Sequence, residues 1–212
     1  MQKRQEFFAI KNGRVKMIDN GGYKTTADAI ILAESANAKS GTVLDVGVGA
    51  GGVALCLLDK NPKLLITGID ISKKMLSDTS VNTLLNGRDI ELLHADIFDW
   101  KTNRLFDFVV TNPPYFSGTA RKDGAHHNVN IYEWTASCVK RLRARGMFFC
   151  IVAPAVMDKV IAALHDGKCG KIEIKPFATS NGIKRVIISA RLGVKTPTKI
   201  FFSIDFDRGK KI

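Results

Sequence analysis

From Thr42 onward the chain alternates short β-rich apolar runs with longer segments of helical periodicity. The β-rich runs read "TVLDVG", "LLITGIDI", "IELLHADIF", "FDFVVTN" and "MFFCIVA", and most are separated by segments with helical spacing of apolar residues. Strands connected through helices lie parallel, and apolar runs without alternation indicate strands covered on both faces. A turn at Ser180 to Gly182 then joins "KIEIKPF" to "KRVIISARL", which predicts an antiparallel edge pair. The sequence therefore predicts an α/β fold with a doubly wound, mostly parallel sheet.

The segment before Thr42 predicts a hairpin and a helix. "FFAIKNGRVKMI" alternates around Asn12-Gly13, a dipeptide typical of tight hairpin turns. "TADAIILAESANA" has helical spacing, as has the stretch from Tyr132 to Arg145. Because no repeat or linker interrupts the chain, we expect one domain over residues 1–212. Within it, 1–22 form a basic hairpin extension, 23–192 the catalytic core and 193–212 a C-terminal extension.

The net charge of +12 would attract a polyanionic partner. Basic residues are spread along the chain, including Lys11, Arg14, Lys16 and the run "KRLRAR", so charge alone fits either a basic surface or nucleic-acid binding. The longest apolar stretch contains Pro154 and is too short to cross a bilayer. We expect a cytoplasmic protein without a membrane partner and, from four scattered cysteines, no metal site. Nothing in the sequence indicates an oligomeric state.

A glycine loop, "LDVGVGAGG", joins the first strand to its helix and fits two motifs. Gly47, Gly49 and Gly52 satisfy G-x-G-x-x-G, the dinucleotide fingerprint. Asp45, Gly47, Gly49 and Gly51 satisfy D-x-G-x-G-x-G, which resembles motif I of the class I S-adenosylmethionine-dependent methyltransferases. A carboxylate beside a pyrophosphate is unfavourable, whereas S-adenosylmethionine carries a sulfonium and an ammonium and no phosphate. Asp45 therefore favours S-adenosylmethionine, with the three glycines of the second motif allowing close backbone approach.

Two further acids follow the next two strands. Asp70 ends "TGID" with Ile71 after it, where a carboxylate can bind both ribose hydroxyls of either adenosine cofactor. Asp96 in "LLHADIF" resembles the methyltransferase acid that binds the adenine amino group, with Ala95 and Ile97 beside the ring. A turn or helix-cap role for Asp96 is the alternative.

The stretch "TNPPYF" predicts a stiff turn at the end of the fourth strand, because proline fixes φ and lacks a backbone donor. Asn112-Pro113-Pro114-Tyr115 resembles motif IV of the amino-methyltransferases, [DNS]-P-P-[YFW]. The resemblance implies that the Asn112 side chain, which also borders the cofactor, and the Pro113 carbonyl accept the two hydrogens of a planar amine, while Tyr115 stacks on the substrate. Asn112, Pro113 and Tyr115 are accordingly the candidate catalytic residues.

Three segments together, "GGYKTTADAIILAESA", "NPPYF" and "AHHNVNIYEWTASCVKRLRARG", resemble the bacterial tRNA adenine-N6-methyltransferases that modify an adenine beside the anticodon of a valine tRNA. The likeness spans roughly residues 7 to 192 and implies a Rossmann-like methyltransferase sheet and a tRNA substrate. It places four residues near the methionine end of the cofactor: Tyr23, Lys24, Thr25 and Asp28. It places Pro114 and Phe116 on the substrate side. Arg121 and Lys122 are candidate RNA contacts in the loop that departs from the family, and His126 is either a substrate contact or a polar loop residue. Where this family has an Arg-His pair, this chain has Ala125-His126-His127.

Other functions remain open from the sequence. Glutamine-N5 methyltransferases of release factors share N-P-P-Y but precede motif I with a substantial helical domain, and guanine-N2 rRNA methyltransferases prefer Phe at the position of Tyr115. A nicotinamide-dependent dehydrogenase would leave Asp45 and the proline turn unexplained. A non-catalytic RNA-binding module would need neither motif.

Overall fold

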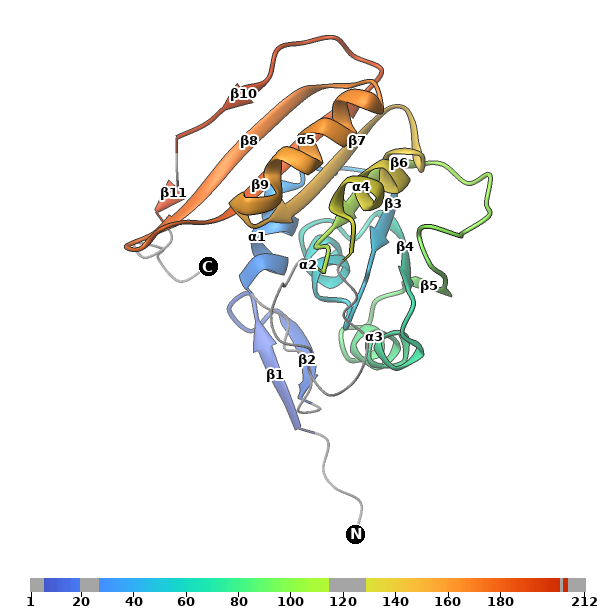
Figure 1. Ribbon diagram of the computed structural model, residues 1–212. Coiled ribbons are helices and arrows are strands. Elements are labelled where there is room, and N and C mark those ends of the chain that lie inside the picture. The colour runs from blue at the N-terminus through green and yellow to red at the C-terminus, as the bar shows by residue number, and fades with distance from the viewer. Residues whose placement is uncertain (1–5, 20–26, 115–128, 203, 206–212) are drawn as a thin grey trace.

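The computed structural model describes residues 6–19, 27–114, 129–202 and 204–205, which form a large mixed sheet with helices on both faces and a separate hairpin (Figure 1). The strands are β1 (Glu6–Ile10), β2 (Val15–Asp19), β3 (Gly41–Val46), β4 (Leu64–Asp70), β5 (Glu91–His94), β6 (Phe106–Thr111), β7 (Leu142–Val152), β8 (Cys169–Thr179), β9 (Gly182–Leu192), β10 (Lys199–Ile200) and β11 (Ile204–Asp205). The helices are α1 (Ala27–Ser35), α2 (Gly52–Lys60), α3 (Lys73–Leu85), α4 (Ile131–Val139) and α5 (Met157–Asp166), with a 3₁₀ turn at Pro154–Val156.

The large sheet has the order β10-β8-β9-β7-β6-β3-β4-β5, with β11 also paired to β8. Strands β7, β6, β3, β4 and β5 are parallel to one another, while β9 runs antiparallel to both β7 and β8. This confirms the mostly parallel sheet with an antiparallel edge pair. The chain passes from β3 to β4 on one side and later returns to β6 on the other. The topological switch therefore lies between the carboxyl ends of β3 and β6.

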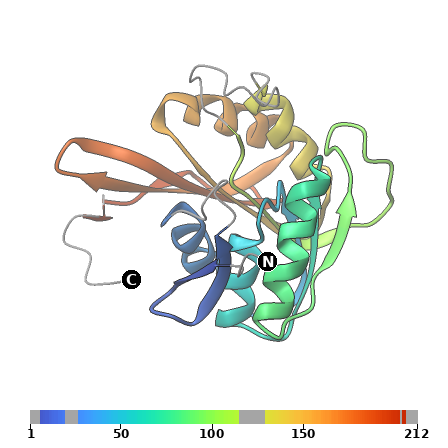
Figure 2. The same ribbon diagram turned by 90° about the horizontal axis from the view of Figure 1, so that it is seen from below.

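Helices cover both faces of the sheet, as Figure 2 shows, with α4 and α5 on one side and α1, α2 and α3 on the other. Successive residues of β3 point to opposite faces, so Val43 packs in the same cluster as Leu55 of α2. Its neighbour Leu44 packs in the cluster that contains Leu164 of α5. Because both faces of β3 are buried, the strand needs an apolar residue at almost every position.

The N-terminal hairpin forms where the sequence predicts it, but its turn is longer than the predicted tight turn. Ile10 pairs with Val15, which leaves four residues in the loop, and Lys11, Asn12 and Gly13 have φ of 51°, 56° and 87°. Val15 is buried in the main core cluster. Lys11, one of the basic residues counted toward a charged surface, is only 4% exposed.

The helix predicted from Tyr132 to Arg145 ends earlier, so that boundary was wrong. Helix α4 stops at Val139 and β7 already begins at Leu142. Leu142 pairs with Phe106 of β6, and both side chains are buried. The register shifts directly after that pair, and Arg145 has a φ of 62°. Burial of Leu142 beside Phe106 therefore draws the charged run into a bulged strand despite its helical propensity.

The C-terminal segment adds strand pairs to the edge of the sheet. Both β10 and β11 pair in parallel with β8, the outer strand of the antiparallel pair, and so cover part of its edge. All four cysteines are buried, as expected of small core residues. In the described part of the chain, no helix is long and apolar enough to cross a membrane.

Candidate active site

The carboxyl ends of four adjacent parallel strands bring the predicted motifs to one edge of the sheet. Val46 of β3 pairs with Ile69 of β4 and with Thr111 of β6, while Asp70 pairs with His94 of β5. The segments that follow these strand ends are the glycine loop, the Asp70 turn, the Asp96 turn and the Asn112-Pro113 turn. Motifs that are far apart in the sequence are therefore neighbours in space.

The glycine loop is held from two sides. The amides of Gly47 and Val48 both donate to the carbonyl oxygen of Ile69, at 2.9 and 3.0 Å. Gly51 has a φ of 86°, and a Cβ there would lie 2.9 Å from the Thr79 methyl group of α3. A side chain at this position would be both strained and crowded, which explains the glycine. The Thr79 hydroxyl also donates to the Gly49 carbonyl oxygen.

Asp45 is a buried carboxyl group that lacks part of its hydrogen bonding. It is 1% exposed, and among the described residues its Oδ2 has no hydrogen-bond partner. Burial raises its pKa from 3.8 to about 7, opposed by a hydrogen bond from the Ala54 amide and assisted by the nearby charge of Asp70. A buried acceptor without a donor is unfavourable, so an added donor would stabilise it. Asp45 therefore fits a ligand that carries an amino group.

Asp70 shapes the turn between β4 and α3. Its Oδ2 accepts the Gly49 amide at 2.9 Å, and its Oδ1 accepts the Ser72 amide at 2.8 Å. Each carboxylate oxygen can accept more than one hydrogen bond, so both retain capacity for ligand hydroxyls. The residue predicted to bind ribose thus also links the glycine loop to its own turn.

The turn after β5 divides its residues between core and surface. The Asp96 carboxylate accepts the Phe98 amide at 2.9 Å, the local turn bond that the alternative for this residue predicts. Ile97 is 3% exposed and packs in the core, so only its backbone remains for a ligand. Ile71 and Phe98, in contrast, are 62% and 44% exposed. Ala95 is half-buried between these environments.

The remaining predicted residues divide between described and undescribed parts of the chain. Asn112 is half-buried, Pro113 buried and Pro114 exposed. Asp28, predicted near the cofactor, is 9% exposed and accepts a hydrogen bond from Arg185 Nε at 2.8 Å. Eight predicted residues lie outside the described residues: Tyr23, Lys24, Thr25, Tyr115, Phe116, Arg121, Lys122 and His126.

Residues 24–164 match the family model of the methyltransferase small domain. The chain belongs to this family. It is an S-adenosylmethionine-dependent methyltransferase, and the partly unsatisfied Asp45 and the free acceptor capacity of Asp70 fit that cofactor.

Individual relatives of this methyltransferase carry different names. A tRNA1(Val) (adenine(37)-N6)-methyltransferase of Glaesserella parasuis is 27% identical over 180 residues, which cover 78% of this chain and 75% of the relative. A release factor glutamine methyltransferase of Flavobacterium psychrophilum is 36% identical over 92 residues, covering 43% of this chain and 32% of the relative. A T. thermophilus 16S rRNA N2 methyltransferase, solved with AdoMet and guanosine, has a TM-score of 0.67 at 19% identity, covering 89% and 50% of the two chains. This last likeness concerns the fold.

Trp134 borders the candidate site and is not among the residues predicted from the sequence. Trp134 of α4 lies against the glycine loop, since a Cβ built on Gly47 would be 3.5 Å from its ring. Its indole N–H donates to the Thr111 hydroxyl at 3.1 Å, and its ring meets that of Phe98 edge-on at 5.9 Å. The sequence pattern predicts a helix over this segment and assigns Trp134 no role. The available signal was its place in the family-like segment after N-P-P-Y, together with a polar indole group that needs a partner when buried.

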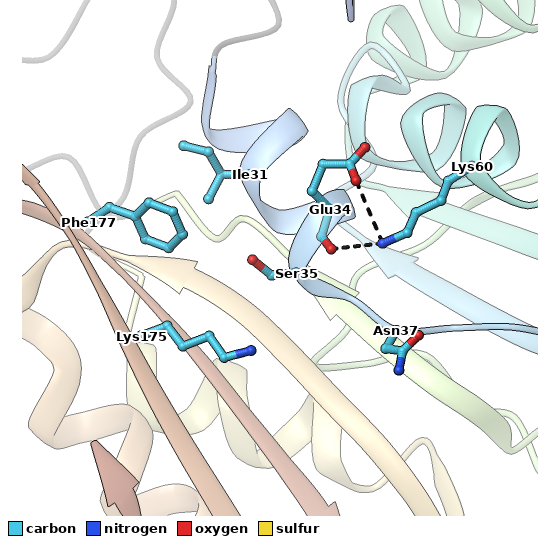
Figure 3. A pocket seen from close by; sticks show the side chains of 7 residues that line it. All are labelled: Ile31, Glu34, Ser35, Asn37, Lys60, Lys175 and Phe177. Carbon is cyan, nitrogen blue, oxygen red and sulfur yellow. Dashed lines mark hydrogen bonds and ion pairs between the residues drawn. The ribbon is translucent and has the colours of Figure 1, made fainter. Parts of the chain in front are cut away.

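A cavity of about 440 Å³ lies elsewhere in the methyltransferase, between α1 and β8 (Figure 3). Ile31 and Phe177 form its apolar wall, and Lys175 and Lys60 add positive charge. The Lys60 ammonium is already bonded to the backbone and carboxylate of Glu34. None of the predicted site residues lines this cavity, so its volume does not mark the reaction centre.

Proposed function

We propose that this methyltransferase transfers a methyl group to the exocyclic N6 amine of an adenine in tRNA. The observation that carries the proposal is the alignment of β3 and β6, whose last paired residues are Val46 and Thr111. The next residues, Gly47 and Asn112, begin the glycine loop and the N-P-P-Y turn side by side. Cofactor and acceptor amine would therefore meet between them.

Methyl transfer requires the protein to bind the methyl donor and to orient the acceptor amine. When bound, S-adenosylmethionine supplies a methyl group made electrophilic by its sulfonium. The Asn112 side-chain oxygen and the Pro113 carbonyl would accept the two amine hydrogens, directing the nitrogen lone pair at the methyl carbon. Held in this way, the amine nitrogen would face the methyl group that the cofactor donates, and the proton that becomes acidic on transfer would pass to solvent. No strong general base is required.

A need for a rigid turn explains the two consecutive prolines. Pro113 is buried at the end of β6, its ring fixes φ, and the following Pro114 restricts ψ, so the direction of the Pro113 carbonyl is constrained. Tyr115 would stack on the base, and Arg121, Lys122 and His126 would contact the RNA around it. The net charge of +12 favours such a polyanion.

The relative named as an adenine-N6 tRNA enzyme supports this substrate because it matches over 78% of the chain. The release factor relative, 36% identical over a shorter segment, favours a second candidate: methylation of a glutamine amide in a protein. A glutamine amide is also planar with two hydrogens on nitrogen, so the same acceptors would serve it.

Incubation with total tRNA from a strain that lacks its own adenine-N6 enzyme, followed by nucleoside mass spectrometry, tests the proposal. We expect new N6-methyladenosine with the wild type and none with Asn112→Ala, while Asn103→Ala, an exposed asparagine outside the site, behaves as wild type. Methylation of a glutamine-containing release factor peptide in place of tRNA would replace the proposal with the second candidate. Unchanged transfer by Asn112→Ala would remove the acceptor role.

A further inference from the structure

Side-chain hydrogen bonds join the carboxyl ends of β3 and β6 where the two strands separate. The Thr111 hydroxyl donates to the Val46 carbonyl oxygen at 2.8 Å and accepts the Trp134 indole N–H at 3.1 Å. Thr111 is fully buried, so a hydroxyl without partners there would be unfavourable. This chain of bonds closes the gap between the strands directly before Gly47 and Asn112.

Trp134 also contacts the glycine loop and the turn that follows β5. Its ring lies behind Gly47 and packs edge-on against Phe98, which follows the Asp96 turn. Helix α4 is fixed at its start by Asn130, whose side chain accepts the amides of Tyr132 and Glu133. One side chain on a well-capped helix therefore contacts the segments that follow β3 and β5 and the last residue of β6.

We propose that Trp134, acting through Thr111, is a positioning residue for methyl transfer. The glycine loop holds the methyl donor and Asn112-Pro113 holds the acceptor amine, so the bonded chain between them sets the distance that the methyl group must cross. The inference rests on the proposed function in one respect: it uses Asn112 and Pro113 as the amine acceptors. It applies to a nucleobase amine or a glutamine amide alike.

Loss of this chain should affect the reaction more than cofactor binding. The glycine loop keeps its bonds to Ile69 and to Thr79 of α3, which do not involve Trp134. The acceptor turn, in contrast, would be held to the loop only by the backbone pairing of β3 with β6, which ends at Val46 and Thr111. A displacement of about 1 Å between reacting groups can slow a reaction on the order of a hundredfold.

The test compares Thr111→Val, which keeps the shape and removes the hydroxyl, with Trp134→Phe, which keeps a ring and removes the N–H. Thr83→Val is the control for Thr111, because the buried Thr83 hydroxyl also donates to a backbone carbonyl, that of Thr79. Trp100→Phe is the control for Trp134, because Trp100 packs on Phe106 away from the glycine loop. We expect kcat to fall about ten- to a hundredfold in the two test variants while the Kd of S-adenosylhomocysteine, measured calorimetrically, stays within about twofold.

The double variant Thr111→Val/Trp134→Phe should be no slower than the slower single variant, because both changes break one chain. A wild-type kcat in both test variants overturns the inference. So does a fall in kcat that is no larger than in Thr83→Val at the same loss of thermal stability. Each variant is assayed on the acceptor that the wild type methylates, whether tRNA or the glutamine peptide. Failure of the proposed tRNA function is then seen in the wild type, and failure of the positioning role is seen in the variants.

Tryptophan fluorescence gives a readout that needs no acceptor. The sequence has two tryptophans, so Trp100→Phe leaves Trp134 as the single emitter. Saturation with S-adenosylhomocysteine should change Trp134 emission, and adding Thr111→Val should shift emission of the free protein. Emission that responds to neither change would show that Trp134 does not sense the glycine loop, and would overturn the inference.

Discussion

Arg185 and Asp28 are 157 positions apart in the sequence and form an ion pair in which Nε lies 2.8 Å from Oδ2. The pair ties the first turn of α1 to the start of β9, and its two side chains are only 25% and 13% exposed. The sequence resemblance assigned Asp28 to the cofactor. The structure gives it a protein partner in Arg185, and its role at the cofactor stays a prediction.

Arg185→Ala should lower the free energy of unfolding by about 1–2 kcal/mol, because it leaves a largely buried carboxylate without its cation. Asp28→Asn should cost less, since the amide keeps an acceptor oxygen for Arg185. A double-mutant cycle by urea denaturation measures the coupling, with Lys184→Ala, an exposed neighbour, as control. Additive effects of the two single changes would show that the pair contributes nothing.

Lys11 should contribute more to the stability of the fold than the exposed cation Arg14. Its Nζ lies 2.7 Å from Glu34 Oε1 and 2.9 Å from Asp59 Oδ2. Burial alone lowers the pKa of Lys11, but hydrogen bonds and charges of Glu34 and Asp59 outweigh burial and raise it. Lys11→Met should therefore cost about 3 kcal/mol at pH 7, whereas Arg14→Met, at a 62% exposed side chain, should cost under about 0.5 kcal/mol.

The direction of the Lys11 shift also predicts a pH dependence. A raised pKa in the folded state means that the folded chain holds this proton more tightly than the unfolded chain. The contribution is complete below the unfolded pKa near 10.4 and is lost as the pH rises through the higher folded pKa. Denaturation at pH values from about 10 upward should show a decline in the free energy of unfolding of the wild type that Lys11→Met lacks; a parallel decline in both would contradict this.

The sequence predicted the sheet well because apolar strand runs report burial on two faces, a local property of residues such as Val43 and Leu44. It also predicted which strand ends carry Asp70 and Asn112, since parallel strands bring their carboxyl ends to one edge. It could not predict Leu142 as a strand residue, because its pairing with Phe106 depends on a distant segment. Nor could it predict Trp134 behind Gly47, since that contact arises from the packing of α4.

Asn82 links the N-terminal hairpin to the glycine loop, and its replacement should disturb both. The fully buried amide donates to the Ala50 carbonyl oxygen at 2.9 Å and accepts the Ile18 amide at 2.7 Å. Asn82→Leu leaves both groups unsatisfied and should destabilise the protein by about 2–4 kcal/mol. Hydrogen exchange at Ile18 should accelerate, and the Kd of S-adenosylhomocysteine should rise.

Asn86, the residue that caps the C-terminus of α3, provides the matched control. Its side chain forms the same pair of hydrogen bonds with the backbone of Lys16, accepting the amide at 2.9 Å and donating to the carbonyl oxygen at 2.7 Å. Asn86 is more exposed than Asn82 and has no hydrogen bond to the glycine loop among those that the structure describes. Asn86→Leu should loosen the hairpin and leave cofactor affinity unchanged. Equal effects of the two variants on cofactor affinity would show that the loop senses the hairpin as a whole.

Asp45 should make the protein less stable as the pH rises from about 4 to about 7. Its folded pKa of about 7 exceeds the ordinary value of 3.8, so in this window the unfolded chain is ionised while the folded chain keeps the proton. The folded state then binds more protons, and stability declines with pH. The gain in the free energy of unfolding that Asp45→Asn brings over the wild type should grow from near zero at pH 4 to on the order of 4 kcal/mol above pH 7.

Binding of the cofactor should release the proton that Asp45 holds in the free protein. A cationic amino group placed near Asp45 favours the carboxylate, so binding of S-adenosylhomocysteine at pH 6 should release a proton and tighten as the pH rises toward 7. Calorimetry in two buffers of different ionisation enthalpy measures the released proton directly. Asp45→Asn should abolish the release, while Asp99→Asn, at an exposed carboxylate beyond the Asp96 turn, should retain it. Binding by the wild type that exchanges no proton between pH 5.5 and 7.5 would place the amino group away from Asp45, and the acceptor for it would have to be sought elsewhere along the glycine loop.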